Sequence, residues 1–104
     1  MTYRVKLTEE FLEEIGEIYY YISSILQAQY AAKRLIKKVN NNLFLLIKSP
    51  KLFMKIEKYT KTKRQYRRIL VNNYVILYTV DEPAKIIYVV HIYYGGRNYI
   101  NNLS

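Results

Sequence analysis

Apolar and polar residues alternate at the start of the chain and then change to a helical spacing. Residues Tyr3–Leu7 alternate apolar with basic side chains, which is the period-two pattern of a half-buried strand. Thr8 then offers a hydroxyl for a helix N-cap, and two glutamates follow where the helix dipole favours negative charge. From Phe11 to Ile25, apolar residues recur at a 4-3-4-3 spacing, which is one face of a helix. A strand followed by a helix is therefore expected.

A second helix is predicted from about Ala28 to Lys48, because its apolar residues again share one face. These residues are Ala28, Ala32, Leu35, Val39, Leu43 and Leu46. Ser49-Pro50 ends this helix, since the residue before a proline avoids helical angles. The break at Ser23–Gln27 is short, so the two helices should form an antiparallel hairpin. The first helix also carries a group of glutamates opposite its apolar face, expected to be solvated: Glu10, Glu13, Glu14 and Glu17.

Three strands are predicted in the last third of the chain. They are Gln65–Val71, Tyr74–Val80 and Lys85–Tyr93, joined by turns at Asn72-Asn73 and Asp81–Ala84. A basic loop without clean periodicity, Lys51–Arg64, precedes them, and Gly95-Gly96 leads into the short tail Arg97–Ser104. The order predicts an α+β fold, with the helical hairpin packed on one face of a sheet. The last three strands form an antiparallel meander, and the first strand pairs along one of them.

Length and composition narrow the functional classes. A chain of 104 residues suits one domain, residues 1–104, around one small core. The sequence has no cysteine and one histidine, so disulfides, thiolate sites and an ordinary zinc site are excluded, and no cofactor or metal is expected. No apolar run is long enough to span a membrane, and the first ten residues lack a signal-peptide core. The expectation is a soluble cytoplasmic protein without a membrane partner.

Charge is divided unevenly along the chain. The net charge is −3 over residues 1–32 and +12 over residues 33–104. A basic field of this size attracts polyanions and acidic partners, although a simple solubility charge is the alternative. The 13 tyrosines suit strands and can stack on bases, although codon usage in an AT-rich genome explains the same count.

The sequence lacks the residue spacings of most classes of active site, and the remaining candidate site residues are basic or aromatic. Residues proposed to contact a target or a nucleic acid are Lys61, Lys63, Arg64, Arg67, Arg68 and Arg97. Metal-free RNA cleavage would need a base for the 2′-hydroxyl, a cation on the phosphate and an acid for the leaving oxygen. His91 suits one proton role because the imidazole titrates near neutral pH, but a lone strand histidine more often packs or faces solvent. Adjacent strand residues face opposite sides, so only one of Arg67 and Arg68 can point at a given site.

Two stretches of the chain, and the motif that closes the second, resemble a known family. They are Tyr66–Asp81 and Ile86–Tyr99, the latter ending in Tyr94-Gly95-Gly96-Arg97-Asn98. They are similar to the RelE/ParE superfamily of bacterial toxins, and the resemblance covers nearly the whole chain. It implies a toxin of a type II toxin–antitoxin (plasmid stabilisation) module, encoded beside a small acidic antitoxin that binds it. The free toxin would then stop growth.

The resemblance allows two mechanisms of growth arrest. RelE-like members cut mRNA in the ribosomal A site, whereas ParE-like members poison DNA gyrase. For the ribonuclease branch, the matching catalytic set is Arg67, His91, Arg97 and Tyr99, with only a loose match at Tyr99. That branch usually has an arginine where this chain has Val75, and His91 and Gly96 stand where many relatives of both branches have arginine. The incomplete set and the long helical hairpin favour gyrase inhibition, and ribosome-dependent mRNA cleavage is the alternative.

Overall fold

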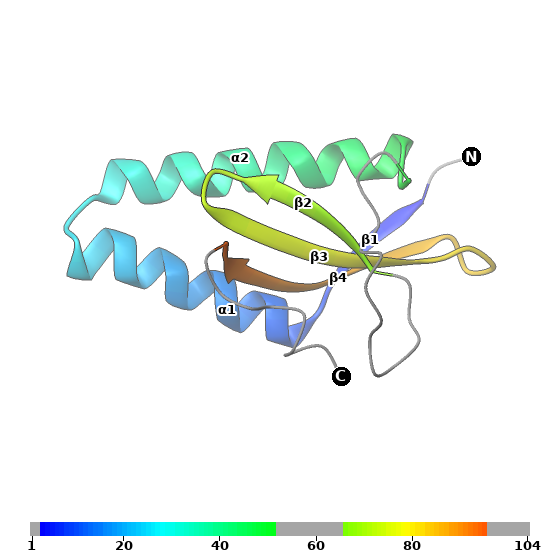
Figure 1. Ribbon diagram of the computed structural model, residues 1–104, viewed down its shortest axis with the longest axis horizontal. Helices are drawn as coiled ribbons and strands as arrows, with labels where there is room; N and C mark the ends of the chain where they lie inside the picture. The colour runs from blue at the N-terminus through cyan, green and yellow to red at the C-terminus, as the bar shows by residue number, and fades with distance from the viewer. Residues whose placement is uncertain (1–2, 52–65, 96–104) are drawn as a thin grey trace.

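The computed structural model describes residues 3–51 and 66–95 of the chain. Its elements are β1 (Arg4–Leu7), α1 (Glu9–Tyr20), the π-helical turn η1 (Tyr21–Ile25), α2 (Gln29–Lys48), β2 (Arg67–Val71), β3 (Tyr74–Asp81) and β4 (Ile86–Tyr94). Figure 1 shows α1 and α2 running antiparallel and joined at one end of the molecule. The predicted α+β order of one strand, two helices and three strands is therefore confirmed.

The four strands form one sheet in the order β1-β4-β3-β2. The last three strands are an antiparallel meander, as predicted, and β1 pairs in parallel with β4, with Val5 opposite Ile87. The β1 pairing ends at Leu7 opposite Val89, whereas β4 continues to Tyr94. The last residues of β4 therefore have no strand beside them on this edge, and α1 packs there instead.

The main core lies between the two helices and one face of the sheet, called here the helix face. Phe11 of α1 and four leucine or valine side chains of α2 pack on buried residues of the three meander strands. The sheet contributes Ile69, Val71, Ile76, Tyr78, Ile87, Val89 and Ile92. Burying a side chain of this size contributes about 1.5–3 kcal/mol, so this layer supplies most of the apolar stabilisation. Within residues 3–51 and 66–95, no helix combines the length and apolar character needed to cross a membrane.

The connection between the helices lies further along the chain than predicted. The expected break at Ser23–Gln27 is wrong for its first three residues, which continue the helix as a π-helical turn. The amide of Leu26 donates to the carbonyl of Tyr21 at 2.9 Å, a bond spanning five residues. The chain reverses only at Gln27, whose φ of 53° lies in the left-handed region. This π-helical turn delays the reversal to Gln27.

The two tight turns of the meander have left-handed residues that set the strand ends. Asn72 has a φ of 54°, as expected from the tolerance of asparagine for this region. Lys85 has a φ of 56° and belongs to the second turn, so β4 begins at Ile86 rather than at Lys85. The other predicted strand ends lie within two residues of the observed ones, within the fraying normal at element ends.

Candidate functional site

The two arginines of β2 point to opposite faces of the sheet. Arg67 is paired with Tyr78, a core residue, so Arg67 lies on the helix face, where its Nη1 donates to the carbonyl of Lys51 at 3.3 Å. Arg68 is paired with Leu77, and Leu77 is paired with His91. Directly paired side chains share a face, so Arg68 and His91 belong to one row on the side away from the helices, called here the open face. The structure therefore brings Arg68, not Arg67, to the side of His91.

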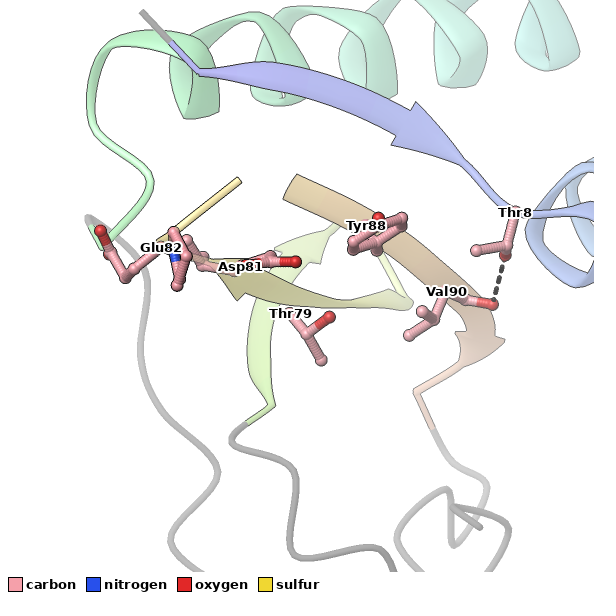
Figure 2. Close-up of a pocket in the computed structure, with 8 residues that line it drawn as sticks. Thr8, Thr79, Asp81, Glu82, Tyr88 and Val90 are labelled. Atoms are coloured by element: carbon pink, nitrogen blue, oxygen red, sulfur yellow. Dashed lines mark hydrogen bonds between the residues drawn. The ribbon is translucent and has the colours of Figure 1, made fainter. Parts of the chain in front are cut away.

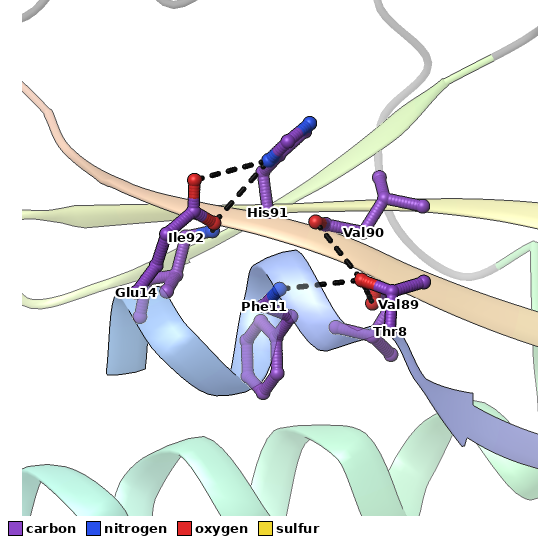
Figure 3. A network of polar contacts seen from close by, with 7 residues as sticks. All are labelled: Thr8, Phe11, Glu14, Val89, Val90, His91 and Ile92. Atoms are coloured by element: carbon purple, nitrogen blue, oxygen red, sulfur yellow. Dashed lines mark hydrogen bonds and ion pairs between the residues drawn. The ribbon is translucent and has the colours of Figure 1, made fainter. Parts of the chain in front are cut away.

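His91 is held by a carboxylate from α1. Its Nδ1 lies 3.1 Å from Oε2 and 3.2 Å from Oε1 of Glu14, and the amide of Ile92 donates to Glu14 Oε1 at 3.1 Å (Figure 3). Because a carboxylate oxygen only accepts, Nδ1 carries the hydrogen of this bond. The other ring nitrogen, Nε2, is then the acceptor atom of the ring.

Glu14 departs from the sequence expectation. The sequence groups it with three solvated glutamates, but its side chain is only 26% exposed and closes the edge of β4 beyond the end of β1. The other three, Glu10, Glu13 and Glu17, are exposed as expected. The helical spacing does indicate that Glu14 differs from the other glutamates, because Glu14 precedes Ile15 and Ile18 and borders the apolar face of the helix. Its partner, 77 residues away, could not be found from that spacing.

The neighbour of His91 on the open face is an aromatic ring that sequence reasoning missed. The rings of His91 and Tyr93 stack with centroids 5.0 Å apart and an interplanar angle of 18°. The pairing of β3 with β4 shifts between Leu77 and Tyr78, so Val90 is an extra residue of β4 without a partner in the register. Such a bulge changes the direction in which the following side chains point. Stacking and the Glu14 contact together restrict the imidazole to one orientation.

The centre of the open face is apolar. Tyr66, Val75 and Leu77 form a small buried cluster there, and Val90 and Tyr93 pack against it. Val75, where the ribonuclease branch would have an arginine, is 4% exposed. Cations lie at the two edges instead, with Arg68 on β2 and Lys6 on β1, the latter paired with Tyr88. The described part of the open face therefore carries its positive charge at the rim rather than at the centre.

A first cavity of about 710 Å³ lies at the end of the sheet formed by the β3–β4 turn (Figure 2). Its lining includes the carboxylates of Asp81 and Glu82, and both have partners. Asp81 accepts from the amide of Ala84 at 3.2 Å, and Glu82 accepts from the hydroxyl of Tyr3 at 2.7 Å. The Tyr3 hydroxyl and the ammonium of Lys51 hold the pKa of Glu82 below its usual value. This acidic end does not suit a phosphate group.

A second cavity of about 670 Å³ lies between α1 with η1 and the other end of the sheet, and five tyrosines line it. They are Tyr20, Tyr21, Tyr74, Tyr93 and Tyr94. The rings of Tyr74 and Tyr94 meet edge to face, with centroids 5.7 Å apart. Burial, followed by the neighbouring phenols of Tyr94 and Tyr21, raises the pKa of Tyr74. This cavity is amphipathic and carries no cation among its described lining residues.

The family-specific motif at the end of β4 lies partly outside the described residues. A Cβ added to Gly95 would lie 2.8 Å from the carbonyl oxygen of Asn73, so the close approach of β4 to the β2–β3 turn requires glycine here. Of the predicted site residues, Lys61, Lys63, Arg64, Arg97 and Tyr99 lie outside the described residues. Within the described ranges, no group of three or more histidine, cysteine or acidic side chains could hold a metal ion.

Comparisons with known proteins agree with this architecture. The fold is similar to that in the crystal structure of the archaeal RelE–RelB complex from Pyrococcus horikoshii OT3, with a TM-score of 0.61, 19% identity, and coverage of 93% of this chain and 99% of that one. It is also similar to the chromosomal ParDE toxin–antitoxin system from P. aeruginosa, with a TM-score of 0.67, 14% identity, and coverage of 88% and 95%. At these identities the likeness concerns the fold alone.

The family assignment rests on a match along the sequence. No curated protein matches the chain. The family described as the ParE toxin of the type II toxin–antitoxin system parDE matches residues 5–99. This match covers nearly all of the chain and agrees with the four-stranded sheet and helical hairpin described above. The chain therefore belongs to the ParE toxin family of type II toxin–antitoxin systems.

Proposed function

We propose that this toxin arrests growth by binding and inhibiting DNA gyrase. The observation that carries the proposal is the burial of Val75 in the apolar centre of the open face. Cleavage of RNA needs a cation beside the scissile phosphate, and the described cations lie at the rim of this face. Inhibition by binding needs only a surface, and a rim of cations around tyrosines supplies one.

The test compares the two targets directly with purified toxin. The toxin is expected to inhibit supercoiling of relaxed plasmid by gyrase and to leave mRNA on programmed ribosomes uncut. A toxin that leaves gyrase unaffected and cuts mRNA in phase with codons would contradict the proposal. The matched control is Arg97→Ala. Because Arg97 belongs to the family motif, this variant is expected to lose the inhibition that the wild-type toxin shows.

Ribosome-dependent cleavage of mRNA is the second candidate, and the contact between Glu14 and His91 favours it. In that reaction the 2′-oxygen forms a bond to the adjacent phosphorus and gives its proton to Nε2 of His91. The bond from phosphorus to the 5′-oxygen breaks, and this oxygen takes up a proton from solvent. Arg68 stands two strand spacings from His91, about 10 Å between Cα atoms, so its long side chain could reach the phosphate.

The two candidates predict different results for one substitution. His91→Ala would abolish codon-phased cleavage if the imidazole accepts the proton. Under the gyrase proposal the same variant still inhibits supercoiling, provided that it folds. Circular dichroism of the purified variant checks folding before either assay is interpreted.

We also propose that the partner of this chain is an acidic antitoxin encoded beside it. The net charge of +12 over residues 33–104 supports an acidic partner, and both similar structures belong to toxin–antitoxin systems. Co-expression with the neighbouring reading frame is expected to yield a stable complex and to relieve growth arrest. Recovery of this protein alone, tolerated by the host without any partner, would contradict the proposal.

A further inference from the structure

The second cavity, between α1 with η1 and the end of the sheet, is called here the tyrosine cavity. Its volume of about 670 Å³ falls within the roughly 300–1,000 Å³ of sites that hold small molecules. Its walls come from α1, from η1, from the first residue of β3 and from the last three residues of β4. Figure 1 shows the end of β4 beside α1, so segments far apart in the sequence meet here. The cavity has the size of a site for one small molecule.

Several large side chains of the tyrosine cavity face solvent instead of packing into the core. Tyr20, Tyr21, Ile25 and Tyr94 all line it, and each is more than half exposed. Burial, and then the phenols of Tyr94 and Tyr21, raise the pKa of Tyr74, so these three phenols lie near one another. Apolar surface left in water adds little to folding stability, and its gathering in one place indicates a surface that binds a ligand.

The π-helical turn η1 supplies one wall of the tyrosine cavity. It contributes Tyr21 and Ile25, and its backbone bond runs from the amide of Leu26 to the carbonyl of Tyr21 instead of that of Ile22. Turns of this kind are rare in helices and are frequent at functional sites. The backbone of this wall is therefore a second indication of a binding site, separate from the exposed rings.

The charge at the tyrosine cavity is negative, in contrast with the chain as a whole. The net charge of the chain is +9, whereas α1 contains five glutamates and no lysine or arginine. Glu14 and Glu17 line the cavity, and none of its described lining residues is a cation. Glu14 is bonded to His91 and to the amide of Ile92 (Figure 3), but the side chain of Glu17 has no such partner among the described residues. The carboxylate of Glu17 therefore suits a cation supplied by a ligand.

We propose that the tyrosine cavity binds a small organic cation, an alkylguanidinium with a short apolar stem. The faces of tyrosine rings attract cations, and a guanidinium stacks on them well because it is planar and weakly hydrated. The carboxylate of Glu17 would accept two of its N–H groups, and Ile18 and Ile25 would contact the stem. The inference does not rest on the proposed function, because neither gyrase nor RNA takes part in it.

Three other occupants fit the tyrosine cavity less well. A metal ion needs several oxygen or nitrogen ligands, and the described ranges hold no group of three or more histidine, cysteine or acidic side chains for one. A phosphate-bearing ligand would meet two carboxylates and no cation of the described lining. An arginine side chain of another protein has the same charged group but fills less of the 670 Å³. The experiment separates this last occupant from a small molecule.

An NMR titration of the full chain with butylguanidinium chloride, at about 150 mM total salt, tests the site. The ring of the single histidine, His91, is the probe, because its partner Glu14 also lines the cavity. Saturable shifts with a dissociation constant of about 1 mM or lower are expected. Butylurea, which has nearly the same shape but no charge, should bind about tenfold more weakly or not at all. Equal binding of butylurea, or no saturable binding of butylguanidinium, would overturn the inference.

Two substitutions locate the bound cation. Glu17→Gln keeps the shape but removes the charge, and it should raise the dissociation constant about threefold. Tyr21→Leu keeps apolar bulk but removes a ring face, and it should raise the dissociation constant about fivefold. The matched controls are Glu13→Gln and Tyr30→Leu, at exposed positions outside the cavity lining, and each should change it by less than about twofold. Circular dichroism checks that all four variants fold.

The remaining outcomes are also decisive. Unchanged affinity in Glu17→Gln, or equal losses in the variants and their controls, would place the cation elsewhere on the chain and overturn the inference. The tripeptide acetyl-Gly-Arg-Gly-amide presents the same guanidinium on a peptide backbone. If it binds about tenfold more tightly than butylguanidinium, the cavity takes an arginine side chain of another protein, and the small-molecule site is refuted.

Discussion

The carboxylate of Glu14 joins α1 to β4 through two bonds, one to Nδ1 of His91 and one from the amide of Ile92. The two side chains lie 77 residues apart in the sequence and are only 26% and 20% exposed. The contact closes the β4 edge that β1 leaves uncovered, and it orients the only histidine of the chain. One carboxylate therefore serves both the fold and the candidate site.

Removal of the Glu14 carboxylate should reduce stability. Glu14→Ala leaves the amide of Ile92 and Nδ1 of His91 without their acceptor, at an expected cost of about 1–3 kcal/mol in the free energy of unfolding. Glu14→Gln keeps one carbonyl acceptor and should cost less. Urea denaturation measures both. The neighbouring Glu13, which is exposed, is the control, and a Glu13→Ala variant should stay within about 0.5 kcal/mol of the wild type.

The hydroxyl of Tyr78 is expected to stabilise the end of α2. Tyr78 is fully buried, and its hydroxyl donates to the carbonyl of Pro50 at 2.8 Å. Tyr78→Phe leaves that carbonyl without this donor, so the free energy of unfolding should fall by about 1–2 kcal/mol. Tyr30→Phe is the comparison, because Tyr30 is 78% exposed and should give no change. Equal stability of both variants would contradict a role for this bond.

Acid should weaken the contacts around Glu82. The hydrogen bond from Tyr3 and the charge of Lys51 lower the pKa of Glu82 in the folded chain from its ordinary 4.5. The folded state therefore binds this proton less readily than the unfolded state. The stabilisation is present above the ordinary pKa and is lost as pH falls through the lowered one.

A pH series of urea midpoints between about 6 and 3 checks this expectation. The wild-type midpoint should fall more steeply below pH 4.5 than that of Glu82→Gln, which has no proton to gain. Parallel curves for the two proteins would show that Glu82 contributes nothing to acid sensitivity.

Arg97, which lies outside the described residues, is expected to matter for toxicity more than for folding. Replacing an arginine that the fold does not need costs under about 0.5 kcal/mol, so on this expectation Arg97→Ala should shift the melting temperature by less than about 4 °C. Growth arrest on induction should be relieved, and Arg97→Lys should restore part of it if positive charge is what the target contacts. An unfolded variant, or one that remains fully toxic, would refute this role.

Much of the fold follows from local patterns in the sequence. The 4-3 spacing located both helices, and alternation with the Asn72-Asn73 turn located the meander, because these signals act over a few residues. The helical connection was misplaced at Ser23–Gln27 since no residue there marks a π-helical turn. For the candidate site, the sequence predicted Arg68 and His91 as members and predicted that Arg67 and Arg68 face opposite sides, but it did not predict which arginine lies on the side of His91.

The sequence by itself determined the α+β plan, the uneven charge, the family motif around Gly95 and the all-basic character of α2, since each is a property of neighbouring residues. Only the tertiary structure decided the partner of β1, which of Arg67 and Arg68 shares a face with His91, and the contact of Glu14 with His91. These depend on strand register and on which edge α1 covers. Contacts between residues distant in the sequence form when the elements pack, so no local pattern encodes them.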